Sequence, residues 1–313
     1  MPCNIKLSQG QNPYITIDLY FLFKNTHNFT FYMLCFPNCK INLGLYITRL
    51  RDDSYHDIET VFYSVAINDV LEIVPVSSAI AVAPAEPIET HLKPSGLTVA
   101  GDQKDNLVWK AYKLLRKAFP LKVTGVDIYL HKVIPMGAGL GGGSADGAFM
   151  LRLLNDYYQL NLNKPQLAIF ALELGSDCPF FIYNTPQFAT GRGEQMNDIS
   201  LDLSPYSIQL ICPPVHMPTS VAFQLITPKQ AAFDLRTLPE LPIEQWKDTI
   251  SNDFEAPVFN QHPVLADIKR QLYDGGAFYA SMSGSGSAIY GIFAKGKKAE
   301  IKTDVGFEGF YAE

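Results

Sequence analysis

Residues 135–145 read Pro-Met-Gly-Ala-Gly-Leu-Gly-Gly-Gly-Ser-Ala, and they decide how the rest of the chain is interpreted. An alternating apolar segment precedes them, and a segment with helical periodicity follows. Glycines let a backbone approach an anion closely, and the first turn of the following helix offers free N–H groups. The stretch therefore predicts a phosphate-binding loop. The alternative is a flexible turn. It is disfavoured because five of seven residues between a strand and a helix are glycines.

This stretch does not match three common types of phosphate-binding loop. Gly137, Gly139 and Gly142 match the dinucleotide-binding pattern, but that fold wants an acidic residue about 20 positions later, where the chain has Leu160–Asn163. A P-loop would need a lysine after the glycines. A protein-kinase loop would be followed by HRD and DFG motifs, and the chain has neither. The loop therefore belongs to a different type.

Two further motifs accompany the glycine-rich loop, one before it and one after it in the sequence. Residues 36–43 read Phe-Pro-Asn-Cys-Lys-Ile-Asn-Leu, and residues 281–287 read Ser-Met-Ser-Gly-Ser-Gly-Ser. With the glycine-rich loop between them, they resemble the three motifs of the GHMP kinase superfamily, which includes galactokinase, homoserine kinase, mevalonate kinase and phosphomevalonate kinase. The resemblance covers Met33 to the end of the chain. It implies a small-molecule kinase.

Within the superfamily, the chain is most similar to the branch that phosphorylates 4-diphosphocytidyl-2-C-methyl-D-erythritol, in the non-mevalonate isoprenoid pathway. The resemblance lies in Lys40–Leu43, Asp53–His56, Gly175–Phe181 and Asn252–Glu255. The chain departs from that branch at Asn38 and Cys39, which replace Pro and Ala, and at Ser54, which replaces Gly. The change at Ser54 bears on a loop expected to shape the substrate pocket.

The resemblance implies an α+β protein with the two-domain GHMP kinase fold. An N-terminal α/β domain over residues 33–189 would bind ATP, a ferredoxin-like domain would follow over 190–313, and the active site would lie in the cleft between them. Residues 1–32 lack clear periodicity, so we expect a non-native or loosely ordered extension. A real extra strand within 14–23 is the alternative, since that stretch has β-type composition.

Apolar periodicity predicts most of the secondary structure. Strands are expected over 41–48, 59–66, 69–76, 125–134 and 207–212, with two more strand-like runs within 278–293. Helices are expected over 105–119, 144–158, 164–174 and 263–274, with shorter ones near 228–233 and 241–248. Prolines mark 83–96 as a surface connection. Gly175 is expected to end its helix in a left-handed conformation.

By resemblance, ATP and Mg²⁺ are the cofactors. The cofactor-binding residues would be those of the loop itself: Pro135, Met136, Gly137, Ala138, Gly139, Leu140, Gly141, Gly142, Gly143, Ser144 and Ala145. Ser144 would cap the following helix or face a phosphate-bound cation. Lys132 and Asn106 would flank the adenine, with a surface lysine on a strand as the alternative for Lys132. Ser283–Gly286 would line the cleft from the second domain.

Phosphoryl transfer to a hydroxyl benefits from a nearby base, and the resemblance assigns this role to Asp177. A helix cap or turn residue is the alternative for Asp177. Lys40 would be a cation close to Asp177, with a strand-edge lysine as the alternative. Asn42 lies two residues further along the same strand, hence on the same face, where it would hydrogen-bond the substrate. By resemblance, Tyr55 would stack on the cytidine base and His56 would hydrogen-bond to it.

Composition excludes several other functions. The net charge of −6 gives no electrostatic reason to bind nucleic acid or an anionic membrane. The five cysteines form no CxxC pair and no zinc pattern, which is typical of reduced thiols in the cytoplasm. The partner is thus a small molecule, and the sequence leaves open a monomer or a weak homodimer. The rival functions are a mevalonate or homoserine kinase, an ATP-dependent decarboxylase, and a non-catalytic binding protein.

Overall fold

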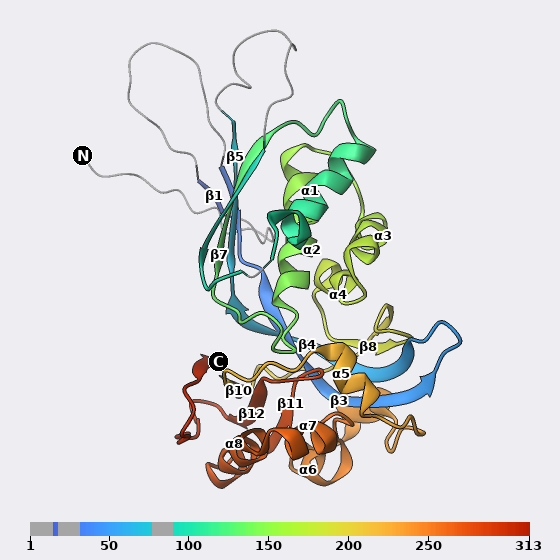
Figure 1. Ribbon diagram of the computed structural model, residues 1–313, viewed down its shortest axis with the longest axis vertical. Helices are drawn as coiled ribbons and strands as arrows, with labels where there is room; N and C mark the ends of the chain where they lie inside the picture. The colour runs from blue at the N-terminus through green and yellow to red at the C-terminus, as the bar shows by residue number, and fades with distance from the viewer. Residues whose placement is uncertain (1–14, 18–31, 77–89, 100) are drawn as a thin grey trace, which may run out of the picture. The chain divides into compact units, whose positions relative to one another are not determined.

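The computed structural model describes residues 15–17, 32–76, 90–99 and 101–313 (Figure 1). It divides into two units, each built from separated stretches of the chain. Unit 1 contains Met1–Pro37, Asn68–Val133 and Gly143–Ile182, and unit 2 contains Asn38–Ile67, Ile134–Gly142 and Tyr183–Glu313. The predicted division has a single boundary near residue 190, whereas the boundary between these units crosses the chain several times.

Unit 1 is built on a sheet with the strand order β1-β2-β5-β7-β6. The strands are β1 (Ile15–Ile17), β2 (Tyr32–Cys35), β5 (Val70–Pro75), β6 (His91–Gly96) and β7 (Val126–Lys132). β6 runs parallel to β7, and the other neighbours are antiparallel. The predicted alternation of β7 is confirmed, because Val126, Ile128 and Leu130 are all buried. Of the connection predicted over 83–96, residues 83–89 lie outside the described residues. β6 corrects the rest, since Pro94 lies in an edge strand, where proline is tolerated.

β1 bears on the leading stretch of the chain. It pairs antiparallel with β2 and lies within residues 14–23, in line with the alternative of an added strand. The expectations for residues 1–14 and 18–31 fall outside the described residues.

Four helices lie on one side of the unit 1 sheet (Figure 1): α1 (Leu107–Ala118), α2 (Gly142–Tyr157), α3 (Lys164–Leu174) and α4 (Cys178–Tyr183). The first three confirm the predicted helices. α3 begins with a capping box in which Asn163 and Gln166 satisfy each other's backbone N–H groups. Gly175 follows α3 with a φ of 164°, which is extended backbone, so the predicted left-handed conformation is wrong.

Unit 2 contains two four-stranded sheets. The first has the order β3-β4-β8-β9, with β3 (Asn38–Leu50), β4 (His56–Asn68), β8 (Gln187–Thr190) and β9 (Gln195–Asp198). Because β4 pairs with β8, β3 and β4 belong to unit 2 and not to the predicted N-terminal domain. Buried side chains of β3 and β4, such as Ile41 and Val61, share one core with Leu210 and Tyr290. This shared core explains why the unit boundary departs from residue 190.

The second sheet has the order β11-β12-β10-β13 and is antiparallel throughout. Its strands are β10 (Tyr206–Cys212), β11 (Tyr279–Met282), β12 (Ile289–Ala294) and β13 (Glu308–Ala312). This is the strand order of a ferredoxin-like sheet. Shorter helices accompany α8 (Pro263–Asp274): α5 (Thr219–Gln224), α6 (Trp246–Thr249) and α7 (Glu255–Gln261). No helix forms over 228–233, where one was predicted.

A ferredoxin-like βαββαβ domain has a second helix before its last strand, but here residues 295–307, all described, contain none. Two glutamine side chains hold this connection instead. Gln209 of β10 donates to the Ala299 carbonyl at 3.0 Å and accepts from the Ala299 N–H at 2.8 Å. Gln271 of α8 forms the same pair of bonds with Lys302, at 2.7 and 2.8 Å. Each hydrogen bond contributes about 1 kcal/mol to stability.

Candidate active site

The three sequence motifs meet inside unit 2. The glycine-rich loop contacts the third motif twice, because Ser283 Oγ donates to the Gly139 carbonyl at 2.8 Å and the Ala288 N–H donates to the Ala138 carbonyl at 3.0 Å. It contacts the first motif through the Lys40 N–H, which donates to the Leu140 carbonyl at 2.9 Å. Segments far apart in the sequence therefore hold the first half of the loop in one conformation.

The loop is glycine-rich for a steric reason at Gly139. Its φ is +79°, and a Cβ placed there would lie 1.9 Å from the Ser283 carbonyl oxygen. No other residue fits this close approach without a backbone shift. Along the rest of the loop Ala138, Leu140 and Ala145 are buried, while Met136 is half exposed.

The Lys40 side chain is buried and its orientation is set by neighbouring polar groups. Its ammonium donates to Asn42 Oδ1 at 2.6 Å and lies 5.1 Å from the centre of the Phe62 ring. Asn42 Nδ2 donates in turn to Thr60 Oγ1 at 3.0 Å. The prediction that Lys40 and Asn42 share one face of the strand is confirmed. The contacts of Asn42 are those of a residue that orients Lys40.

The segment Asn252–Glu255 supports the third motif. Asn252 Nδ2 donates to the carbonyls of Met282 and Gly284, each at 2.8 Å. Glu255 Oε1 accepts from Ser281 Oγ at 2.9 Å and from the Met282 N–H at 2.8 Å. The sequence marked this segment as a family feature without assigning it a role. The structure shows that it holds the turn over Ser283–Gly286 in place.

Asp177 and Ser144 lie near each other in unit 1. Asp177 is partly buried and directly precedes α4. The next residue, Cys178, lies beside Ser144, and burial raises the pKa of its thiol to about 12. The thiol is therefore neutral and serves as a packing group. The residue predicted as the base thus directly precedes, along the chain, a residue that lies beside the start of α2.

The two residues predicted to flank adenine have other contacts. Asn106 caps α1, since its Oδ1 accepts from the Val108 N–H at 2.9 Å. Lys132 has a side chain only 1% exposed, so the alternative of a surface lysine is wrong. Its ammonium pairs with Asp69 and with Asp146, the latter at 2.8 Å. These contacts do not support a place for Lys132 beside the adenine.

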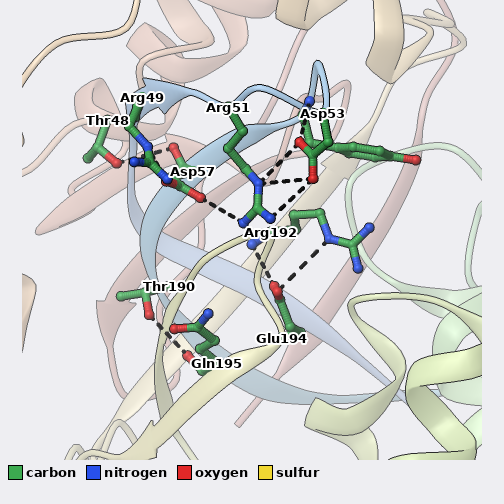
Figure 2. A network of polar contacts seen from close by, with 10 residues as sticks. Thr48, Arg49, Arg51, Asp53, Asp57, Thr190, Arg192, Glu194 and Gln195 are labelled. Carbon is green, nitrogen blue, oxygen red and sulfur yellow. Dashed lines mark hydrogen bonds and ion pairs between the residues drawn. The ribbon is translucent and has the colours of Figure 1, made fainter.

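Figure 2 shows the polar contacts around the turn between β3 and β4. Tyr55, predicted to stack on the base, ends this turn, and His56, predicted to hydrogen-bond to it, begins β4. Arg51 spans the turn and bonds to both Asp53 and Asp57. Ser54, where the resemblance led us to expect Gly, adopts a φ of 66°, a left-handed conformation that favours glycine. The turn therefore keeps a glycine-type conformation despite the substitution.

Aromatic partners that the sequence did not reveal lie next to this turn. The ring of His56 stacks on Phe223 of α5, with centroids 4.8 Å apart and planes inclined by 19°. Tyr55 is 56% exposed, and the Arg192 guanidinium lies 4.9 Å from the centre of its ring. The arrangement offers flat surfaces on which a planar ring can stack.

His216 is a further residue that the sequence did not single out. Its Nδ1 would lie 3.6 Å from a Cβ built on Gly137, so the imidazole stands directly beside the glycine-rich loop. Nearby, Ser287 Oγ donates to the Val215 carbonyl at 2.6 Å. The segment that carries His216 is thus tied to the third motif.

Among the described residues, no group of three or more His, Cys, Asp or Glu side chains is placed to hold a metal ion. A magnesium ion that arrives with ATP needs only one or two protein ligands beside phosphate and water oxygens. None of the helices in the described part of the chain has the length and apolar content to span a bilayer.

Comparison with known proteins extends this picture. Residues 106–185 match the family model of the GHMP kinases N terminal domain, and residues 238–309 match that of the GHMP kinases C terminal. A 4-diphosphocytidyl-2-C-methyl-D-erythritol kinase of Bacteroides thetaiotaomicron is 49% identical over 261 residues, which cover 83% of this chain and 92% of that protein.

Two solved structures are also similar to this chain. The crystal structure of a 4-(cytidine 5'-diphospho)-2C-methyl-D-erythritol kinase matches with a TM-score of 0.69 and 29% identity, over 83% of this chain and 90% of that one. A homoserine kinase from Cytophaga hutchinsonii matches with a TM-score of 0.67 over 94% of this chain and 97% of that one. Its identity of 15% shows a shared fold alone.

Proposed function

The chain belongs to the GHMP kinases, and from this premise we propose that it transfers the γ-phosphate of ATP to the C2 hydroxyl of 4-diphosphocytidyl-2-C-methyl-D-erythritol. The observation that carries the kinase proposal is the meeting of the three motifs, in which Lys40 and Ser283 both bond to the glycine-rich loop. The 49% identical relative carries the choice of acceptor. The product would be the 2-phosphate of that compound, an isoprenoid precursor.

ATP would bind with its phosphates along residues 137–144. The N–H groups that open α2 have no partner within the helix, and together with the helix dipole they favour an anion. A Mg²⁺ ion bound with ATP would be held by Ser144, and it would neutralise charge on the phosphates. The glycine-rich loop supplies backbone donors, and Gly139 lets it pack closely on the third motif.

Phosphoryl transfer needs positioning and charge stabilisation more than covalent chemistry from the protein. Asp177 would accept the proton of the C2 hydroxyl as its oxygen forms a bond to the γ-phosphorus. The bond between that phosphorus and the β–γ bridging oxygen breaks, and ADP leaves. The Lys40 ammonium, oriented by Asn42, would polarise the hydroxyl and stabilise the negative charge that develops on its oxygen.

The cytidine end of the acceptor would be recognised in unit 2. The exposed ring of Tyr55 and the stacked pair His56–Phe223 supply faces for the base. The His56 ring nitrogens supply hydrogen bonds to its edge. Mevalonate and homoserine have no base to place there, so these residues would separate the proposed acceptor from theirs.

An acceptor panel tests this proposal. ADP release by the purified full-length chain is followed with ATP, Mg²⁺ and, in turn, the cytidylyl methylerythritol, mevalonate, homoserine and galactose. We expect turnover with the cytidylyl compound alone. Turnover with another acceptor would retain a kinase and discard the cytidine site. ATP binding without turnover on any acceptor would favour a decarboxylase or a binding protein.

A further inference from the structure

Three ionisable side chains are buried together in unit 1, and none has a part in the transfer described above. Lys132 is the last residue of β7, Asp69 joins β4 to β5, and Asp146 lies one turn into α2. Their side chains are 1%, 0% and 4% exposed. The Lys132 ammonium pairs with Asp69 and with Asp146 Oδ2, the latter at 2.8 Å. We call these three residues the Lys132 triad.

The triad joins the two ends of the loop. Lys132 directly precedes the segment 133–145, and Asp146 directly follows it. The ion pair between them therefore closes this segment at its base. Asp69 holds the strand end in a second way, because its Oδ1 accepts from the Val133 N–H at 2.5 Å. Its own N–H donates to the Pro37 carbonyl at 2.9 Å, which anchors Asp69 beside β2.

Stability alone is a poor explanation for the Lys132 triad. Burying charges costs solvation, and apolar side chains of similar volume often serve a core equally well or better. Asp146 Oδ1 is buried and has no hydrogen-bond partner among the described residues. Stability alone therefore does not account for the three buried side chains, and a role in the loop is the better explanation.

The glycine-rich loop is the element that the Lys132 triad can hold in an ordered conformation. Gly137, Gly139 and Gly141 all have φ near +70° to +80°, and glycines lose more conformational freedom on ordering than other residues. A loop that is already ordered before binding loses less entropy when its ligand arrives. Closing the two ends of the segment with buried bonds is one way to order it in advance.

We propose that Lys132, Asp69 and Asp146 are positioning residues that hold the two ends of the glycine-rich loop at the spacing needed to bind the phosphates of ATP. The triad acts through the loop and contacts no substrate. The proposal rests on the proposed function, since it assumes that the loop binds ATP.

The test compares ATP affinity with stability. In Lys132→Met we expect the KM for ATP and the dissociation constant of a non-hydrolysable ATP analogue to rise roughly tenfold or more, a common size for such coupling. The KM for the acceptor stays unchanged. Amide hydrogen exchange of the segment 133–145 becomes faster, because its ends are released.

Lys132→Met removes the cation that faces two buried carboxylates and loses stability for that reason alone. The double variant Lys132→Met, Asp146→Leu removes one of these charges and fills the space with apolar atoms. We expect it to recover thermal stability while ATP binding stays weak. Leu115→Ala, in the buried face of α1, gives a matched loss of Tm away from the loop. Its KM for ATP is expected to stay at the wild-type value.

Two results would overturn the proposal. One is a KM for ATP in Lys132→Met that rises no further than in Leu115→Ala at the same loss of Tm. The other is a double variant that regains ATP affinity together with stability. Failure of the wild-type chain to bind the ATP analogue would instead overturn the proposed function, so the two failures are distinguishable.

Discussion

The ammonium of Lys40 donates a 2.6 Å hydrogen bond to Asn42 Oδ1, two residues further along β3. Alternate residues of a strand face the same side, so local geometry alone brings the two side chains together. Thr60 of β4 completes the chain of bonds, because it accepts from Asn42 Nδ2 and donates to the Gly44 carbonyl at 2.6 Å. The lysine that we propose to be catalytic is thereby oriented by groups that need not touch the substrate.

Asn42→Ala should lower kcat by about 100-fold, the cost of misplacing a reacting group by about 1 Å. The KM for the acceptor should change little if Asn42 acts through Lys40, and it should rise if Asn42 binds the acceptor directly. Steady-state kinetics with both substrates separates these outcomes. Asn197→Ala, at an exposed position of β9, is the control and should behave like the wild type.

Asp177→Asn should lower kcat by roughly 10²- to 10⁴-fold, because the acceptor hydroxyl loses its proton acceptor. Binding of ATP, measured by calorimetry without the acceptor, should persist. Asp52→Asn, in the exposed β3–β4 turn, is the matched control. Wild-type turnover in Asp177→Asn would remove the base assignment.

Phe223→Ala should raise the KM for the cytidylyl acceptor by roughly ten- to a hundredfold, since stacking of a base on an aromatic ring contributes about 1–3 kcal/mol. The KM for ATP should stay the same. Phe307→Ala removes an aromatic ring that is 39% exposed and belongs to no motif, and it should leave both constants unchanged. A normal acceptor KM in Phe223→Ala would place the base elsewhere.

Gly139→Ala should destabilise the fold by at least about 2 kcal/mol, because it combines a strained φ with a backbone clash. The new Cβ would lie 1.9 Å from the Ser283 carbonyl oxygen. Gly276→Ala is the control for strain alone, since its φ is +95° with nothing within 4 Å of the new Cβ. Urea unfolding of both variants measures the difference, and equal losses would argue against the close packing of the loop on the third motif.

Stability should depend on pH through Asp146. Its pKa rises from 3.8 in the unfolded chain to about 8 in the folded one, mainly because of burial. Between these values the folded state holds a proton that the unfolded state has released, so the free energy of unfolding falls as pH rises from about 4 to about 8. Asn at position 146 cannot ionise.

The wild type should therefore lose stability relative to Asp146→Asn across this range. Urea unfolding at about pH 5 and about pH 8 measures the difference between the two proteins. A constant difference would show that Asp146 does not titrate in this window.

The sequence predicted the elements that carry strong local signals. β7 alternates its apolar residues, and α3 has Asn163 and Gln166 at its start, so each could be recognised from neighbouring residues alone. α4 could not be recognised from the sequence, because all of its side chains except that of Tyr183 are buried and an apolar run has no periodicity. β6 was missed because Pro94 normally argues against a strand, and only its edge position permits one.

The residues of the candidate site also fall into two groups, those that sequence motifs predict and those that only the tertiary fold brings together. Lys40, Asn42 and the glycine-rich loop could be found from motifs, and their contacts agree with that reading. The burial of Lys132 could not, because its partner Asp69 lies 63 residues earlier in the chain. Phe223 was also missed, since only the tertiary fold brings α5 beside His56.

Phosphorus NMR can follow a reaction that contains the full-length chain, ATP, Mg²⁺ and 4-diphosphocytidyl-2-C-methyl-D-erythritol, and it reports directly whether phosphate reaches the acceptor. We expect a new phosphomonoester signal on the acceptor that grows in step with ADP. Release of inorganic phosphate without a phosphomonoester, or no loss of ATP at all, would contradict it.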